Sequence, residues 1–338
     1  MNKVKIGIVG CGKQAPKHLS GLRKIPGVEL ILADIDTDFA AELGRKEGLA
    51  WADDIEDIFG DKDITAVDIC TPTQSHVDLI RRAVESGKDF FCEKPLCEKM
   101  EEARALHDLL ASSQRFGMVG YIYRFSPVFE LGYSLFEDVP LVGESMVLGK
   151  IVSAFFRLGG RGSHQVWKHR KANGGGAINE MLVHMIDLAL WYFGPVQEAE
   201  VLACDLLRPK RVIQGKEEEA DAEDYVLIRL KTKSGVEVLC QADLVTPAFT
   251  QFVEVQGENG TFMGSIQQDM PSFIYCQEDA AGYPKGKTML SFGKVNLFDA
   301  QMAEFVRGLR LKRKPSRCTL DDSLAILETL DLLNKGKP

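Results

Sequence analysis

A short apolar segment that runs straight into a glycine-rich turn constrains this chain more than any other feature. Val4–Val9 is typical of a buried strand, and the next residues, Gly10-Cys11-Gly12-Lys13-Gln14-Ala15, open a helical pattern. In such a unit the first glycine allows the tight turn, the second lets the backbone approach a pyrophosphate, and the small third residue allows close helix–strand packing. The free N–H groups of the helix would face the phosphates. The predicted cofactor-binding residues of this loop are Gly10, Gly12, Lys13, Gln14 and Ala15.

A carboxylate follows the next strand. Val28–Ala33 ends in Asp34, at the position where an acidic residue accepts hydrogen bonds from the adenosine ribose. Ile35 and Asp36 follow in place of a cation, so a 2′-phosphate would meet negative charge. We therefore expect NAD as the cofactor, with NADP disfavoured, and Asp34 and Ile35 beside it. The alternative is that Asp34 only caps the helix that follows.

Strands and helices keep alternating up to about residue 122. Further strands are expected at 66–70, 89–92 and 116–122, with helices between them, which predicts a parallel, doubly wound sheet. Ligands of such sheets lie beyond the carboxyl ends of the strands. The residues expected on that rim are Cys70, Thr71, Pro72, Glu93 and Lys94. His76 follows closely in the sequence. Two alternatives stay open for it: a position near the cofactor, or an ordinary position on a helix face.

The second part of the chain follows a different pattern. At 338 residues with 45% hydrophobic content, the chain is long enough for two domains. We predict a Rossmann domain over 1–122 and an α+β domain over 123–338 with a mainly antiparallel, open sheet, so the chain is α/β overall. Strands are expected at 142–152, 197–206, 225–232, 236–244, 252–256 and 260–266. The charged stretch 216–224 is expected to be a solvated loop.

Charge and cysteine usage narrow the class of protein. The net charge of −8 argues against nucleic acid and against anionic membranes as partners. No signal peptide or apolar run long enough for a bilayer is present, which favours a cytoplasmic protein. Of the eight cysteines, only Cys92 and Cys97 lie close together, so we predict reduced thiols and no metal site. An open sheet with one uncovered face favours a homodimer or homotetramer.

The stretch 174–194 holds the strongest catalytic candidates. Three glycines precede an apolar helical pattern that ends at Gly194. Glu180, His184 and Asp187 have the spacing i, i+4 and i+7, which places them on one face of the helix. The alternative is a core histidine that is satisfied by a neighbouring acid.

Several motifs occur in the order found in a known family. They are Gly-x-Gly, Cys70-Thr71-Pro72 with His76, Glu93-Lys94-Pro95, Arg124-Phe125-Ser126-Pro127 and the glycine-triplet helix. The chain resembles the glucose–fructose oxidoreductase, inositol dehydrogenase and rhizopine-catabolism (Gfo/Idh/MocA) family over essentially its whole length.

The resemblance implies an NAD-dependent dehydrogenase that acts on the CH–OH group of a sugar, polyol, cyclitol or nucleotide sugar. It implies that Lys94 holds the reacting oxygen, that His184 moves the proton, and that Glu180 either orients His184 or contacts a hydroxyl. It further implies that Arg124 lies near the cofactor and Trp167 near the substrate, and that the last helix, 320–333, packs back on the first domain. Arg161 could reach a substrate anion. The family usually has Asp where Glu180 stands and Gly where Leu182 stands, so the substrate stays open.

Two other functions are compatible with the same motifs. One is a glycoside-processing enzyme that retains NAD and oxidises its substrate transiently. The other is a non-catalytic sugar sensor on the same fold, which predicts loss of Lys94 or His184, although both are present.

Overall fold

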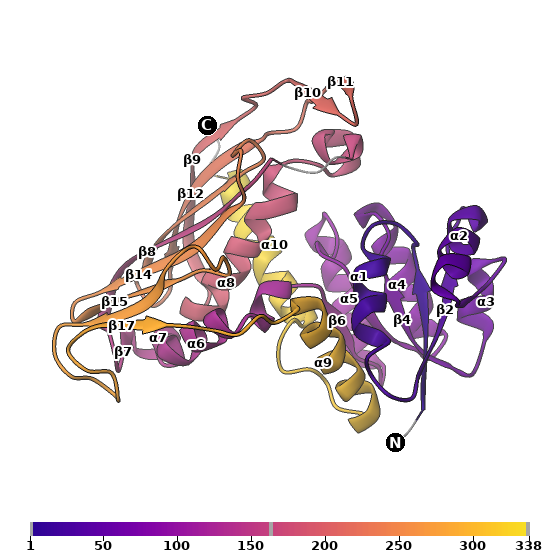
Figure 1. Ribbon diagram of the computed structural model, residues 1–338, viewed down its shortest axis with the longest axis horizontal. Coiled ribbons are helices and arrows are strands. Elements are labelled where there is room, and N and C mark those ends of the chain that lie inside the picture. Colours follow the sequence, from indigo (N-terminus) through magenta and orange to yellow (C-terminus); the bar gives the residue numbers. More distant parts are fainter. Residues whose placement is uncertain (1–2, 162–164, 336–338) are drawn as a thin grey trace. The chain divides into compact units, whose positions relative to one another are not determined.

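The computed structural model describes residues 3–161 and 165–335 (Figure 1). Contacts divide the chain into two compact units. The first unit holds residues 1–125 and 295–324, and the second holds residues 126–294 and 325–338. The segment 295–324 therefore belongs with the N-terminal residues. The domain boundary at residue 122 therefore stays a prediction, while the two units divide after residue 125.

A six-stranded parallel sheet forms the centre of the first unit. Its order is β3-β2-β1-β4-β5-β6, which has a switch point between β1 and β4. The strands are β1 (Val4–Val9), β2 (Val28–Ala33), β3 (Ala50–Trp51), β4 (Ile64–Ile69), β5 (Asp89–Cys92) and β6 (Gly117–Val119). The expected Rossmann architecture is confirmed, and β6 is shorter than the expected strand 116–122.

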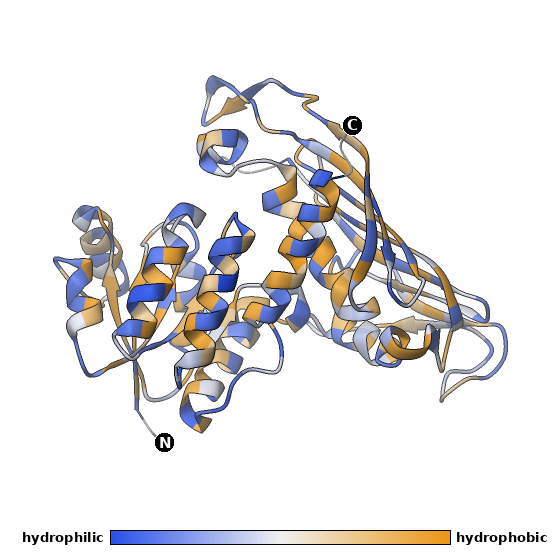
Figure 2. Cartoon of the chain, turned by 180° about the vertical axis from the view of Figure 1, so that it is seen from behind, coloured by the Kyte–Doolittle hydropathy of each residue, from blue (hydrophilic) through white to orange (hydrophobic). Residues whose placement is uncertain are grey.

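Amphipathic helices accompany this sheet. Figure 2 shows both hydrophilic and hydrophobic residues on these helices. They are α1 (Ala15–Leu22), α2 (Thr37–Glu47), α3 (Ile55–Gly60), α4 (His76–Glu85), α5 (Met100–Ser112) and α9 (Leu297–Leu311), with 3-10 turns η1 (Thr73–Ser75) and η2 (Ile122–Phe125). The final helix, α10 (Leu320–Lys335), begins in this unit: the hydroxyls of Tyr121 and Ser323 lie 2.9 Å apart.

A mixed nine-stranded sheet forms the second unit. Its order is β17-β16-β15-β14-β8-β13-β12-β9, with β7 paired to β8, and the β8–β13 pair is parallel among antiparallel neighbours. The strands are β7 (Glu144–Ser145), β8 (Gly149–Gly159), β9 (Val196–Asp205), β12 (Tyr225–Thr232), β13 (Glu237–Asp243), β14 (Thr250–Gly257), β15 (Gly260–Gly264), β16 (Ser272–Cys276) and β17 (Gly286–Leu290).

Helices pack on one face of this sheet. Contacts join α8 to β8 and β13, and α6 to α8 and β15. The helical elements are α6 (Pro127–Phe136), α7 (Val139–Val142), the π turn η5 (Ile178–Leu182) and α8 (Val183–Phe193), with 3-10 turns η3 (Val166–His169) and η4 (Lys171–Asn173). None of the helices in the described ranges is long and apolar enough to cross a membrane.

Two sequence predictions for the second unit are wrong. The expected strand 142–152 is interrupted, because Gly143 and Gly149 have φ of +75° and +72° and separate α7, β7 and β8. The expected loop 216–224 begins as a strand, β11 (Lys216–Glu219), which pairs antiparallel with β10 (Lys210–Ile213). Gln214 and Gly215 both have positive φ, as a two-residue hairpin turn of type I′ requires.

Candidate active site

The glycine loop has the geometry expected of a pyrophosphate site. Gly10 has a φ of +95°, and a Cβ there would lie 2.8 Å from the carbonyl carbon of Cys70, so the chain needs glycine. A Cβ on Gly12 would meet nothing within 4 Å, which leaves room for a phosphate beside the backbone. Ala15 is fully buried at the start of α1, as close packing predicts. These residues fit a dinucleotide. In the same turn, Lys13 is exposed and Gln14 is half-buried.

Asp34 joins β2 to this loop. Its Oδ2 accepts a 2.7 Å hydrogen bond from the Cys11 N–H, and its Oδ1 accepts one of 3.0 Å from the Asp36 N–H. The cap of α2 is instead Asp36, which accepts from the Asp38 N–H, so the capping alternative for Asp34 is not what the structure shows. Each carboxylate oxygen has a second lone pair for a ribose hydroxyl. Ile35 is 92% exposed beside it.

The turn after β4 lies at the switch point. Thr71 is half-buried and Pro72 is exposed. His76, in contrast, is buried: its Nε2 lies 2.9 Å from the Thr71 carbonyl oxygen and its Nδ1 lies 2.9 Å from the Pro95 carbonyl oxygen. Burial lowers the pKa of His76 and outweighs the hydrogen bonds to the two carbonyls, which raise it. His76 thus joins the Thr71 turn to the segment after β5.

That segment carries the candidate lysine. Glu93 is buried, Lys94 is half-buried, and the Lys94–Pro95 peptide bond is cis. The Glu93 N–H donates to the Ile69 carbonyl at 3.0 Å, which continues the β4–β5 pairing to the rim of the sheet. The lysine therefore follows directly from a fixed strand end.

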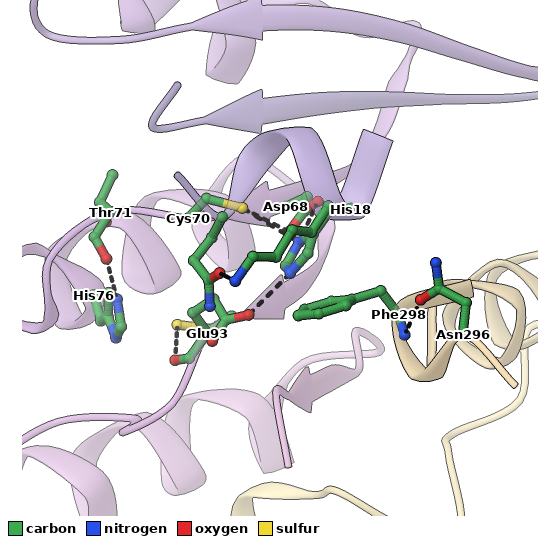
Figure 3. Close-up of polar contacts among 11 residues, drawn as sticks. His18, Asp68, Cys70, Thr71, His76, Glu93, Asn296 and Phe298 are labelled. Carbon is green, nitrogen blue, oxygen red and sulfur yellow. Dashed lines mark hydrogen bonds and ion pairs between the residues drawn. The ribbon is translucent and has the colours of Figure 1, made fainter. Parts of the chain in front are cut away.

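Sequence reasoning missed the buried partners of Glu93. His18, on α1, lies between Asp68, Cys70 and Glu93, as Figure 3 shows. Ligand atoms of His18, Asp68 and Cys70 all lie within 4.8 Å of one another, close enough to hold a metal ion. No local signal marks this cluster, because Asp68 and Glu93 lie 50 and 75 residues from His18 in the chain.

Arg124 lies in a buried ion pair. It is 3% exposed, and its guanidinium donates to Asp322 at 2.9 Å. Its carbonyl accepts from Arg317 at 2.7 Å. This ion pair lies in the interior of the first unit, and a contact of Arg124 with the cofactor stays a prediction.

In the second unit the glycine triplet allows a tight entry to the helix. A Cβ on Gly175 would lie 2.5 Å from the Lys168 backbone, and one on Gly176 would lie 2.2 Å from the Glu223 carboxylate. Glu223 in turn accepts from the N–H groups of Ala177 and Ile178. Gly175 and Gly176 thus let the segments around residues 168 and 223 meet the first turn.

The expected regular helix begins as the π turn η5, which contains Glu180. Such turns are frequent at functional sites. Glu180 is half-buried and ion-paired with Lys168, whose ammonium also lies 5.1 Å from the centre of the Trp167 ring. His184 is 9% exposed on α8, and Asp187 is 1% exposed. Sequence reasoning missed Lys168 as the partner of the candidate residue Glu180.

The rim of the second sheet is fixed by arginines. Arg161 donates to the Pro247 carbonyl at 2.7 Å. Arg211, on β10, donates to Asp224 at 2.8 Å and to the Leu244 carbonyl at 2.9 Å, and Asp224 is 1% exposed. The acid at the end of the predicted loop is therefore a buried anchor of the hairpin.

The fold and the glycine loop define a dinucleotide-binding protein, and comparison with known proteins identifies it as an oxidoreductase. Residues 4–121 match the model of the "oxidoreductase family, NAD-binding Rossmann fold", and residues 142–263 match that of the "GFO/IDH/MocA C-terminal domain". The chain belongs to the Gfo/Idh/MocA family and is an NAD-dependent dehydrogenase.

Relatives of known name support this assignment. A levoglucosan dehydrogenase of Pseudarthrobacter phenanthrenivorans is 25% identical over 84% of this chain and 80% of its own length. An inositol 2-dehydrogenase of Rhizobium meliloti is 27% identical over 78% of this chain and 76% of its own length. A levoglucosan dehydrogenase structure in complex with NADH and L-sorbose has a TM-score of 0.86 at 20% identity, covering 99% of this chain and 97% of that one, which shows the same fold.

Proposed function

We propose that this dehydrogenase transfers a hydride between NAD and a secondary alcohol of a sugar, polyol or cyclitol. The observation that carries the proposal is the placement of Lys94 at the end of β5, on the rim that holds the glycine loop and Asp34. The names of the relatives support the substrate class, because they act on levoglucosan and inositol.

The reaction needs a group that stabilises the developing oxyanion and a group that accepts the hydroxyl proton. The nicotinamide ring accepts or donates the hydride when it is bound. We assign the first role to the Lys94 ammonium, since a fixed cation stabilises charge that develops on oxygen. We assign the second to His184, because histidine is the side chain that most often accepts or donates a proton in catalysis.

We infer that Glu180 and Lys168 select the substrate. A carboxylate accepts hydrogen bonds from hydroxyls, while an ammonium donates them. Their ion pair therefore offers both kinds of contact to a polyol, and Trp167 adds an apolar face at the same place. We keep Arg161 and Arg124 as further candidate contacts to substrate and cofactor.

Localisation and assembly are part of the same proposal. The eight cysteines form no disulfide, which fits a reducing compartment, and we infer the cytoplasm. We infer a homodimer or homotetramer that uses the face of the large sheet turned away from α6 and α8. Exposed apolar side chains on its strands include Val152, Leu202, Leu239, Tyr275 and Met289.

A spectrophotometric screen tests the function. NAD reduction would be followed with inositols, hexoses, anhydrosugars and uronates, with the variants Lys94→Ala and His184→Ala as controls for the assigned chemistry. We expect His184→Ala to lower turnover by roughly 10²–10⁴-fold with NADH affinity nearly unchanged. Full turnover by both variants would contradict the assignment.

A further inference from the structure

A buried histidine bridges two carboxylates at the base of the Lys94 segment. The Nδ1 atom of His18 lies 3.0 Å from both oxygens of Asp68, and its Nε2 lies 2.9 Å from Oε1 of Glu93 (Figure 3). The side chains of His18 and Asp68 have no exposed surface, and that of Glu93 is 9% exposed. The ring therefore has one acid at each nitrogen, away from solvent.

Counting protons defines the state of this ring. An ionised carboxylate only accepts hydrogen bonds, so with both acids ionised each ring nitrogen carries a proton to bond its own acid. Burial is the largest single influence and lowers the pKa of His18, but Asp68 and Cys70 together outweigh it and raise that pKa well above its usual 6.5. Burial raises the pKa of Cys70 to about 12, so this residue stays a thiol and donates to Asp68 at 3.6 Å.

Aromatic rings enclose the cluster. The Phe91 ring meets the imidazole edge-on with centroids 5.3 Å apart, and the Phe298 ring, from α9, lies at 5.7 Å. Hydrogen bonds between charged groups are strong in such low-dielectric surroundings, and a partner left alone there is costly. The arrangement therefore holds the Glu93 carboxylate in one position.

The position of the Glu93 carboxylate affects the neighbouring Lys94. Gly120 packs against Glu93, since a Cβ there would lie 3.3 Å from Oε2. On the other side of Lys94, the Pro95 carbonyl faces His76 at 2.9 Å. Lys94 thus stands between two residues that are each held by a buried histidine.

We propose that His18 is a positioning residue for Lys94, because its ring, bonded to Asp68 through Nδ1 and to Glu93 through Nε2, fixes the Glu93 carboxylate and with it the end of β5. The effect on turnover rests on the dehydrogenase function proposed above. The protonation state of the ring does not, so the two claims can fail separately.

The first measurement needs no substrate. In the full-length protein labelled with ¹⁵N-histidine, we expect both nitrogens of His18 to carry a proton at neutral pH, with the resonance assigned by its loss in His18→Gln. In Asp68→Asn the ring should keep the proton on Nε2, facing Glu93, and lose the one on Nδ1. A single protonated nitrogen in the wild type would overturn the proposal, as would a stoichiometric metal ion in the purified protein.

The second measurement is steady-state kinetics on a substrate from the screen. We expect His18→Gln to lower kcat by about 10²-fold, since a misplacement of about 1 Å has that effect, with KM changed by less than about threefold. Asp68→Asn, which keeps the contact with Glu93, should lower kcat much less. His107→Gln is the matched control, because His107 is a half-exposed histidine paired with Asp321 at the surface of the same unit.

The outcomes separate cleanly. A kcat for His18→Gln within about threefold of the wild type would overturn the positioning role. If His18→Gln does not fold, Asp68→Asn still tests the positioning role. A fall in kcat that is fully accounted for by the loss of folded protein would mean a structural role only. If no alcohol is oxidised by the wild type, the proposed function fails while the ¹⁵N result stands.

Discussion

The N–H of Cys11 donates a 2.7 Å hydrogen bond to Oδ2 of Asp34, so one carboxylate joins the glycine loop to the end of β2. The same carboxylate is the expected acceptor for the ribose hydroxyls. Changes at Asp34 should therefore alter both the order of the loop and the choice of cofactor.

We predict that Asp34→Ser combined with Ile35→Arg shifts preference from NAD toward NADP. The double change removes a negative charge and adds a cation at a position that is 92% exposed and can accept a long side chain. Fluorescence titration with NADH and NADPH measures the ratio of affinities. Ile35→Gln is the control without charge, and wild-type protein that binds NADPH more tightly than NADH would contradict the reading of Asp34.

The two loop glycines should respond differently to alanine. Gly12→Ala should weaken NADH binding without loss of stability, because the new methyl group meets no protein atom within 4 Å. Gly10→Ala should destabilise the fold by about 1–3 kcal/mol, because its φ is +95° and the methyl group would press on the Cys70 backbone. Urea unfolding and NADH titration of both variants separate the two effects. Equal losses of stability in Gly10→Ala and Gly12→Ala would contradict this prediction.

The ion pair between Lys168 and Glu180 should set substrate affinity. We predict that Lys168→Met raises KM for the best substrate by about 10-fold, the size expected for one hydrogen bond to a charged group, with kcat changed little. Glu180→Asp shortens the acid away from Lys168 and should change the ranking of substrates. Lys171→Met, on the exposed neighbouring turn, is the control. A fall in kcat alone for both site variants would instead indicate that Glu180 orients His184.

Stability should depend on pH through His18. A group whose pKa is raised on folding stabilises the fold below its unfolded value, near 6.5, and this contribution is lost as pH rises through the folded pKa. Between about pH 7 and more alkaline values, the free energy of unfolding should therefore fall more steeply for the wild type than for His18→Gln. Urea denaturation across this range measures the difference, and parallel curves would contradict it.

Cysteine reactivity offers a further check on burial. Burial raises the pKa of Cys11 to about 12 and that of Cys97 to about 11, whereas Cys204 is exposed on β9. Thiolates are the reactive form, so iodoacetamide should modify Cys204 first. Peptide mass spectrometry of the native protein measures the order, and Cys204→Ser should remove the fast phase. Earlier labelling of Cys97 would be inconsistent with the structure.

The sequence identified what is encoded locally. The β1 strand, the Gly10 turn and the acid at the end of β2 lie within 31 residues, and their periodicities and turn chemistry suffice to predict them. The rim positions of Thr71 and Lys94 follow from the alternation of strands and helices.

Long-range pairings could not be predicted in the same way. His18 is an ordinary buried position of an amphipathic helix until Asp68 and Glu93 are brought beside it. Lys168 sits in an irregular segment whose contact with Glu180 depends on the glycines that follow. The hairpin β10–β11 was misread because its charged residues suggested solvent, although they pair across two strands: Lys210 with Glu217, for example.

The attachment of that hairpin has a practical consequence. Strands β10 and β11 form a sheet of their own, and Arg211 fastens it through Asp224 and the carbonyl of Leu244. A replacement hairpin that keeps an arginine at position 211 and the aspartate at 224 could therefore be grafted without altering the register of the large sheet. This segment is a natural insertion point for hairpin libraries that leave the large sheet intact.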